Sequence, residues 1–432
     1  MRPGPTAGAP ALRGGVLHRA VSRTRQAWGR PLTAYYLVAG SAVLIAALGL
    51  VMVFSASQIQ ALRSGLPATF YLTRQVMAAA AGSVLVLLAA RMPVPWHRWL
   101  AIPLLVSSVA LLGLVQVPGL GRTVNGSTNW LAVGGPFAIQ PSEFGKAAFV
   151  VWGADLLARK QQHRLLGQWT HLLVPLVPGA LLLVGMVLLG GDMGTAVILS
   201  AMLFGMLWLV GAPLRLFVVT LTGAGLLAAV LITTSAHRVS RFACLGASDP
   251  GPGDQCWQVV HGMYALSTGG LFGNGIGASL EKWGQLPEPH TDFIFAVTGE
   301  ELGLVGTLTV LGLFAALCAA GLRIAVRASE PFVRLVAGGV VTWIATQATI
   351  NIGGVLGLLP IAGVPLPLFS YGGSALIAAL YAVGLLLAVA RSEPAVRAAL
   401  TARKRARVSA RPGLLRRRRA GGRPRRSVFP GG

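Results

Sequence analysis

The chain has 432 residues, of which 54% are hydrophobic and only 11% are charged, whereas soluble domains carry about 25% charged residues. This composition excludes an ordinary soluble enzyme and is typical of a protein embedded in a membrane. The formal net charge of +24 could suggest a nucleic-acid-binding protein, but 20 of the 36 basic residues lie in the terminal segments 1–32 and 391–432. We therefore expect no nucleic-acid partner.

Ten segments of the chain are apolar and about 20 residues long, the length that an α-helix needs to cross ~30 Å of hydrocarbon. They lie near residues 35–55, 73–91, 98–116, 141–158, 171–190, 194–211, 214–233, 299–322, 332–355 and 371–390. The first follows a polar, arginine-bearing stretch and lacks a small-residue cleavage site, which predicts a retained helix rather than a signal peptide. The expected fold is an all-α polytopic membrane protein with about ten transmembrane helices.

The distribution of arginine and lysine predicts how these helices are oriented, because positively charged loops stay in the cytoplasm. An even number of helices puts both termini on one side, and cytoplasmic termini place 29 of the 36 basic residues on that side. Nine of the twelve acidic residues then lie on the outer side. A large outer loop, about 234–298, is expected between the seventh and eighth helices.

The expected domain organisation has three parts. A basic N-terminal tail, 1–32, and a basic C-terminal tail, 392–432, flank a membrane domain over 33–391. The C-terminal tail has arginine runs interrupted by glycine and proline and cannot bury apolar surface, so it is predicted to be disordered. It is expected to rest on anionic lipid of the inner leaflet; the alternative is a tail that binds a protein partner.

Asp292 is the most informative residue of the large outer loop, because an apolar run follows it at once, where the chain re-enters the membrane. Ionisable groups at membrane depth are energetically costly and are therefore candidates for function. The alternative is an acid that only caps a helix. Glu300 and Glu301 follow and could cap helices, pair with cations or shape the same cavity. The glycines within 269–277 do not fit a phosphate-binding loop, since no strand precedes them and no GK[ST] follows.

A second group of polar residues opens the fourth predicted helix. Glu143 and Lys146 are three residues apart on one helical face. They either form a buried pair that fixes the helix or leave Lys146, with Arg122, to bind an anionic substrate group. Further along, residues 357–374 contain three prolines and four glycines, and such irregular backbone near membrane depth indicates a cavity.

Two further pairs of residues are expected to tie elements together. Cys244 and Cys256 fall in the same exported loop, where an oxidising exterior permits a disulfide; two free thiols are the alternative. Cys318 lies in an apolar helix and is expected to fill the core. Gln347 and Asn351 are spaced by one helical turn and are expected to hydrogen-bond between helices.

Three segments of the sequence resemble the SEDS family, whose members act in shape, elongation, division and sporulation. They read NGSTNWLAVGGPFAIQPSEFGK (125–146), LPEPHTDFIFAVTGEELGLVG (286–306) and NIGGVLGLLPIAGVPLPLFSYGGS (351–374). The similarity covers about 33–391 and is strongest to division-type members. It implies a peptidoglycan glycosyltransferase that polymerises lipid II at the outer face of a bacterial cytoplasmic membrane, at the division septum. An elongation-type polymerase, a lipid II flippase and a non-catalytic scaffold are the alternatives.

The resemblance also implies a site. The family's essential carboxylate, in its HTDFIF-like segment, corresponds to Asp292, which is expected to act as the general base in a displacement that inverts the anomeric centre. The leaving diphosphate would be stabilised by outer cations or by a bound divalent ion, Mg²⁺ or Mn²⁺; no other cofactor is expected. The candidate substrate-binding residues are Arg74, Arg122, Glu143, Lys146, Lys282, Glu300 and Ser370.

One residue departs from the family pattern. Many relatives have arginine directly before the tryptophan of the first segment, where this chain has Asn129, and Arg122 could substitute for that cation.

The implied partners are the lipid II substrate, a class B penicillin-binding protein with transpeptidase activity, other membrane proteins of the division machinery, and membrane lipid.

Overall fold

The structure is a computed structural model of the whole chain. It describes residues 30–124, 127–134, 137–220, 222–223 and 256–409. The described residues within 34–390 form one compact unit, the membrane unit, and the described terminal residues, 30–33 and 391–409, belong to another. The two units are described separately.

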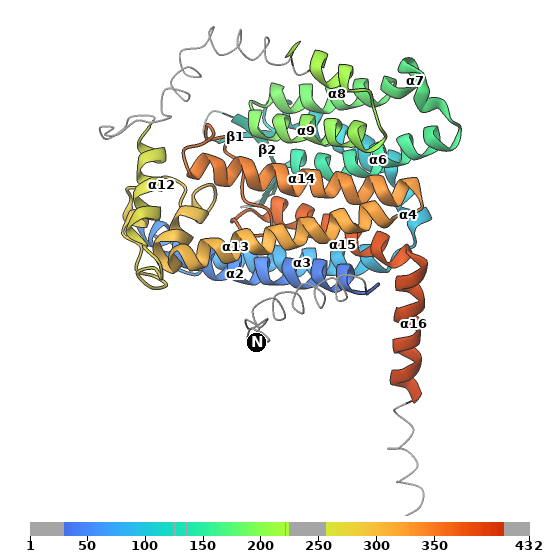
Figure 1. The fold of residues 1–432 in the computed structure, drawn as a ribbon. Coiled ribbons are helices and arrows are strands. Elements are labelled where there is room, and N and C mark those ends of the chain that lie inside the picture. The colour runs from blue at the N-terminus through green and yellow to red at the C-terminus, as the bar shows by residue number, and fades with distance from the viewer. Residues whose placement is uncertain (1–29, 125–126, 135–136, 221, 224–255, 410–432) are drawn as a thin grey trace, which may run out of the picture. The chain divides into compact units, whose positions relative to one another are not determined.

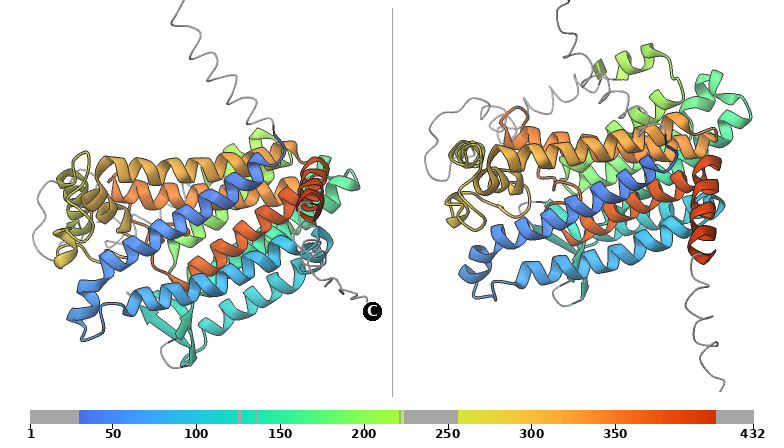
Figure 2. Two further views of the ribbon diagram at one scale, coloured as in Figure 1. Left: turned by 90° about the horizontal axis from the view of Figure 1, so that it is seen from below. Right: turned by 60° about the horizontal axis from the view of Figure 1, so that its bottom comes forward.

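The membrane unit is built from long helices that lie side by side with roughly parallel axes (Figures 1 and 2). The long helices are α2 (Thr33–Arg63), α3 (Phe70–Arg91), α5 (Ala101–Val115), α6 (Pro141–Gln162), α8 (Leu176–Leu189), α9 (Met193–Leu209), α13 (Ile294–Arg327), α14 (Pro331–Val355) and α15 (Gly373–Ser392). Shorter helices are α4 (Val94–Trp99), α7 (Trp169–Leu173) and α12 (Trp257–Thr268), with 3₁₀ turns at Leu165–Gly167 and Glu281–Trp283.

Seven helical segments of the described chain are long and apolar enough to cross a membrane. They are Thr33–Arg63, Phe70–Arg91, Val94–Val115, Thr170–Leu189, Ile294–Arg327, Pro331–Val355 and Gly373–Ser392. Helix α9 is apolar but has only 17 residues, α6 carries buried charged residues, and most of the predicted span 214–233 lies outside the described residues. The helical polytopic fold is confirmed, and the count of ten spans stays a prediction.

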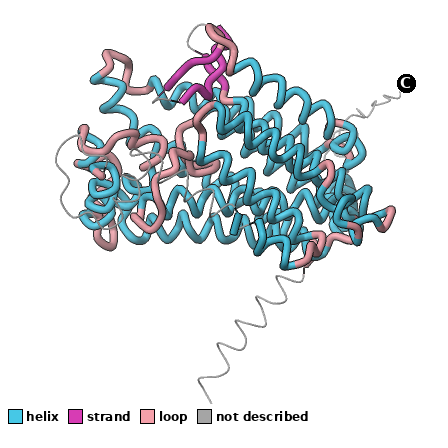
Figure 3. The backbone as a smooth tube through the Cα atoms, turned by 90° about the horizontal axis from the view of Figure 1, so that it is seen from above, coloured by secondary structure: helices cyan, strands magenta, loops and turns pink. Residues whose placement is uncertain are grey.

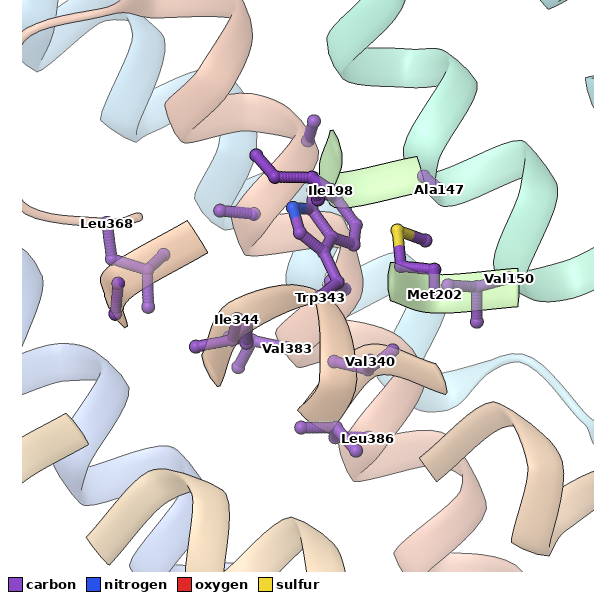
Figure 4. Close-up of a cluster of buried hydrophobic side chains, with 14 of the residues drawn as sticks. Ala147, Val150, Ile198, Met202, Val340, Trp343, Ile344, Leu368, Val383 and Leu386 are labelled. Atoms are coloured by element: carbon purple, nitrogen blue, oxygen red, sulfur yellow. The ribbon is translucent and has the colours of Figure 1, made fainter. Parts of the chain in front are cut away.

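The centre of the membrane unit is formed by α14 and α15. Of the most apolar stretch of α15, 83% of the residues are buried, against 22% for α3, so α3 presents most of its apolar surface outward, as lipid contact requires. Figure 4 shows part of the hydrophobic core, where Trp343 of α14 lies near Met202 of α9 and Val150 of α6. This packing holds α14 rigidly, and α14 carries one wall of the site.

A small antiparallel sheet at one end of the membrane unit is the first departure from the expected all-helical fold (Figure 3). Strands β1 (Gly121–Val124), β2 (Ser127–Gly134) and β3 (Phe137–Ile139) pair in the order β1-β2-β3. Their β-branched and aromatic residues favour strands. The turn signal Asn125-Gly126 falls between β1 and β2, although these two residues lie outside the described part of the chain.

Helix α13 is the second departure, because it begins five residues before the predicted span 299–322. It is broken at Gly303, where φ is +66° and ψ is −163°, and a chain segment from the outer loop lies along the break. The amide of Leu304 donates to the carbonyl of Gly270 (2.9 Å), and the amide of Gly275 donates to that of Glu301 (3.0 Å). A Cβ at position 303 would lie 2.4 Å from a backbone nitrogen, so the crossing requires glycine.

The terminal unit corrects one expectation. Helix α16 (Pro394–Ser409) covers the first part of the tail that was predicted to be disordered. Alanine and arginine are favourable helix formers, and proline is well suited to a first helical position, so local propensity is enough to explain it. The tails 1–29 and 410–432 lie outside the described residues.

Candidate active site

The sequence-predicted site residues lie at the end of the membrane unit that carries the sheet, the segment 256–293 and the loop 356–372; this is called the sheet end (Figure 1). Asp292 lies there, in a tight turn directly before α13. The turn begins at Glu288, whose φ is +49° and whose carbonyl accepts hydrogen bonds from the amides of Thr291 (3.3 Å) and Phe293 (3.4 Å). Asp292 is thereby held at the point where the chain enters α13.

Asp292 faces a small pocket between the start of α13, the end of α14 and the loop after α14. The pocket is lined by Asp292, Phe293, Ile350, Asn351, Gly354, Val355, Ile361, Ala362, Gly363 and Val364. The N-cap position of α13 is occupied by Phe293, and no side chain caps this helix. The alternative interpretation of Asp292 as a helix cap is therefore not supported, and its carboxylate stays available to the pocket.

The environment of Asp292 makes its carboxylate a proton acceptor suited to neutral pH. Part of the residue reaches the surface, yet protein atoms surround most of the carboxylate, and this burial raises its pKa to about 7, with Glu288 and Asp192 adding to the increase. Among the described residues, no cation forms a salt bridge with it. A base of this strength can take a proton from a hydroxyl that is attacking a substrate.

His290 supports the turn and was not among the predicted site residues. It is 3% exposed, and its ring contacts those of Tyr71 (centroids 4.6 Å apart) and Tyr371 (5.2 Å). Burial lowers its pKa to about 4, so the ring is neutral at physiological pH. Its carbonyl accepts the amide of Tyr371 at 2.9 Å. His290 thus anchors the turn. The sequence signal that could have identified it as a site residue was its position two residues before Asp292.

Arg74 is the predicted cation that the structure brings to this turn. It lies in the first turns of α3, with its guanidinium 4.3 Å from the ring centroid of Phe70. It also forms a hydrogen bond with the side chain of Tyr371. Burial raises the pKa of Tyr371, and the hydrogen bond with Arg74 partly offsets this by lowering the pKa. Because Tyr371 contacts His290, Arg74 is linked through these two side chains to the turn that carries Asp292.

Glu143 and Lys146 lie in a separate buried cluster. Lys146 is fully buried and donates to Glu143 Oε1 and to Gln347 Oε1, both at 2.8 Å. Gln347 also accepts from Trp343 Nε1 (2.7 Å) and donates to the carbonyl of Pro365 (2.7 Å). These bonds join α6, α14 and the loop after α14. The geometry favours the structural account of the pair.

Lys282, a predicted outer-loop cation, is also buried. Its side chain is 1% exposed, with Nζ 2.6 Å from Glu301 Oε1 and 3.2 Å from Ser55 Oγ. Next to it, Glu300 accepts from Ser279 Oγ (2.5 Å) and from the amide of Leu280 (2.6 Å). The outer loop folds along the break in α13 and so buries these groups. They join α2, α13 and the loop.

The remaining candidates are dispersed. Arg122 is exposed on β1, opposite Trp130, while the hydroxyl of Ser370 accepts the amide of Leu366 (2.8 Å) and serves the loop backbone. Cys318 has a free thiol. Cys244 lies outside the described residues, so its disulfide with Cys256 stays a prediction.

No divalent-cation site is preformed in the described part of the chain, where no group of three or more His, Cys, Asp or Glu residues could hold a metal ion. Mg²⁺ commonly binds through one or two carboxylates together with substrate phosphates. The predicted divalent cation therefore stays a prediction.

Comparison with known proteins places this geometry in context. The cell cycle protein family of FtsW, RodA and SpoVE matches residues 35–394. The chain is 40% identical over 382 residues to the probable peptidoglycan glycosyltransferase FtsW of Mycobacterium tuberculosis, covering 88% of this chain and 72% of that protein. It is 37% identical over 351 residues to the stage V sporulation protein E of Bacillus subtilis, covering 81% and 94%.

Two solved structures are similar over most of the chain. One belongs to work on the structural coordination of polymerization and crosslinking by a peptidoglycan synthase complex; it has a TM-score of 0.67 and 30% identity and covers 82% of this chain and 97% of that one. The other is the rod shape determining protein RodA of Thermus thermophilus, with a TM-score of 0.61, 30% identity and coverage of 84% and 97%.

Proposed function

We infer that this chain, which belongs to the FtsW, RodA and SpoVE family of cell cycle proteins, is a membrane-embedded peptidoglycan glycosyltransferase of the FtsW type. Relatives that carry this name cover most of the chain at 35–40% identity, and the structural neighbours come from a peptidoglycan synthase complex and from RodA. The observation that carries the mechanism is Asp292, a buried carboxylate with no salt-bridge partner among the described residues.

The reaction joins lipid II units at the outer face of the membrane. The 4-hydroxyl of one sugar attacks the anomeric carbon of another, and Asp292 takes the proton of that hydroxyl as the new glycosidic bond forms. The bond between the anomeric carbon and the polyprenyl diphosphate breaks, and the diphosphate leaves with the electron pair. A single displacement inverts the anomeric centre, from an α-linked lipid to a β-linked glycan. The pKa of about 7 suits Asp292 to this step.

The leaving diphosphate gathers negative charge and needs cations that are in place before the reaction. Arg74 is the candidate supported by its position next to the turn that carries Asp292, and Arg122 is exposed on the sheet at the same end. A divalent cation bound with the substrate could share this work. Lys146 and Lys282 are already occupied by buried carboxylates.

The proposed partner is a class B penicillin-binding protein, which would crosslink the glycan as it forms. The structural neighbour in a peptidoglycan synthase complex supports such a pairing, and the FtsW-type relatives favour a place at the division septum. The basic terminal segments are expected to lie on the cytoplasmic side.

The test is polymerisation of lipid II by the purified full-length protein with its transpeptidase partner. Wild type should produce glycan strands, and Asp292→Ala should produce them at less than about a tenth of that rate, since general-base catalysis contributes roughly 10²–10⁴-fold. Glu281→Gln serves as the control because it alters an outer-loop carboxylate that pairs with His261 (2.6 Å). An Asp292→Ala protein that polymerises lipid II at more than about a tenth of the wild-type rate would contradict the base assignment. Transport of lipid II across vesicles without polymerisation by wild type would favour the flippase alternative.

A further inference from the structure

Asn351 lies on α14, one helical turn before its end, and lines the same pocket as Asp292. It is 6% exposed. Its side-chain nitrogen Nδ2 donates two hydrogen bonds, one to the backbone carbonyl of Asp292 and one to that of Val364, both at 2.9 Å. One amide group therefore joins the rigid central helix to the two irregular segments that form the pocket.

These two hydrogen bonds act next to the bond from the amide of Tyr371 to the carbonyl of His290 (2.9 Å), and they hold the backbone of Asp292 itself and that of Val364. The turn before α13 and the loop after α14 are not held to each other by a sheet or a helix, and their buried carbonyls need donors. Asn351 supplies both donors. Across the pocket, a Cβ added at Gly363 would lie 3.9 Å from Asp292 Oδ2, so the carboxylate lies against the backbone of the loop that Asn351 fixes.

The other end of the Asn351 amide is not used by these two bonds. Its oxygen Oδ1 is buried and has no hydrogen-bond partner in the part of the chain that the structure describes. A buried polar atom without a partner costs roughly 1–3 kcal/mol, and each such atom in a native structure calls for an explanation. An apolar side chain of the same size would avoid this penalty but could not donate to either carbonyl.

We propose that Asn351 is a positioning residue for catalysis, which holds the Asp292 carboxylate in the pocket at a fixed distance from the attacking hydroxyl. This inference rests on the proposed function, in which Asp292 is the base. Asn351 itself takes no proton and touches no reacting atom. Its effect is on the geometry and the solvation of the base, and misplacing a catalytic group by about 1 Å can lower a rate about 10²-fold.

Asn351→Leu tests the proposal, because leucine fills a similar volume and cannot donate. In the full-length protein with its transpeptidase partner, kcat for lipid II polymerisation should fall about 10- to 100-fold while KM stays within about threefold, since a positioning residue does not bind the substrate. Asn351→Ser, which keeps one donor on a shorter side chain, should lie between wild type and Asn351→Leu. Thr342→Val is the matched control on α14, since within the described chain the hydroxyl of Thr342 donates to its own helix, at the carbonyl of Gly338 (2.9 Å).

The pH profile distinguishes positioning from a merely structural role. Release of the turn should let water reach Asp292 and lower its pKa, so the acidic limb of kcat against pH should move to lower pH. The titratable groups that act on Asp292 are Glu288 in the same turn and Asp192 at the start of α9, and neither is changed; His290, in the same turn, is neutral in this range.

The outcomes separate this inference from the proposed function. A wild-type rate and an unmoved acidic limb in Asn351→Leu, with Asp292→Ala inactive, would overturn the role of Asn351 and leave the base assignment intact. Equal loss in Asn351→Leu and Thr342→Val, or a lowered kcat with an unmoved limb, would also overturn it. An active Asp292→Ala protein would instead overturn the proposed function.

Discussion

Glu143 and Glu301 each lie beside a buried lysine at the sheet end, whereas Asp292, at the same end, has no salt bridge to any described residue. Each paired glutamate has its charge compensated, with lysine nitrogens 2.8 Å and 2.6 Å away. Asp292 has two acidic neighbours instead, Glu288 and Asp192. Under the proposed function, the difference teaches that burial alone does not mark a catalytic carboxylate. Glu300 is also buried without a salt bridge, but two donors, Ser279 Oγ and the amide of Leu280, hold it. Among the described residues, Asp292 has neither a countercharge nor such donors, which leaves it able to take a proton.

Breaking a buried pair should have the largest effect on stability. Lys282→Met leaves Glu301 buried without its cation, which should lower the free energy of unfolding by about 3–5 kcal/mol. Lys146→Met should have a similar effect on Glu143, because Lys146 is as buried as Lys282. Thermal unfolding in detergent measures both.

A double variant serves as the control for this prediction. Lys282→Met combined with Glu301→Leu removes both charges and should be more stable than Lys282→Met alone, since replacing a whole buried pair by apolar groups is often neutral. A Lys282→Met protein that unfolds at the wild-type temperature would contradict the view that this pair is structural.

The unpaired carboxylate should make the rate depend on pH. Asp292 acts as a base only when ionised, and its pKa is about 7, so the rate should fall as pH decreases below 7. At pH 5 about 1% of Asp292 would be ionised and the rate should be about 100-fold lower. Initial rates of lipid II polymerisation from pH 5 to 8 measure this, with thermal unfolding at each pH as the control. A flat profile would show that Asp292 is not the base.

The two arginines at the sheet end should also differ in how much they contribute to the reaction rate. Arg74, next to the Asp292 turn, should matter more than Arg122, which is exposed on the sheet. Arg74→Met should lower kcat/KM for lipid II about tenfold and Arg122→Met less than about threefold, because exposed charges interact weakly through water. The reverse order would place the diphosphate at the sheet.

The smallest effect is expected from the C-terminal tail. Removal of residues 394–432 takes away α16 and most basic residues of the tail. Under the predicted topology these lie on the opposite side of the membrane from Asp292, so polymerisation in detergent should be unchanged, while binding to anionic vesicles should weaken in a salt-sensitive way. Lost polymerisation by a correctly inserted truncated protein would contradict that topology.

The helical fold could be predicted from sequence because apolar runs of membrane length are a strong local signal. The start of α13 and its break at Gly303 could not, because both depend on distant contacts. Glu300 and Glu301 lower the local hydropathy there, and their partners Ser279 and Lys282 come from the outer loop. The sheet was missed because β1 and β3 have only four and three residues, and the eight residues of β2 do not alternate regularly between polar and apolar.

For the site, the place of Asp292 before an apolar run pointed to it, and the resemblance strengthened this. The sequence could not sort the lysines, since Lys146 and Lys282 are buried by partners that lie far away in the chain or on other elements. Nor could it show that His290 packs between two tyrosines or that Asn351 bonds the backbone of Asp292. These roles arise only when α3, α14 and the loop after α14 pack against the turn.

The most direct measurement compares Asp292→Asn with Glu301→Gln, because each replaces a carboxylate by an amide of nearly the same shape. Both variants are assayed for lipid II polymerisation and for thermal unfolding. Asp292→Asn should lose about 10²-fold or more in rate with an unfolding temperature close to wild type, since no partner is left unpaired. Glu301→Gln should lower the unfolding temperature clearly, because Lys282 stays buried without its countercharge. A nearly wild-type rate for Asp292→Asn, or equal destabilisation by the two changes, would contradict the division between a catalytic carboxylate and structural ones.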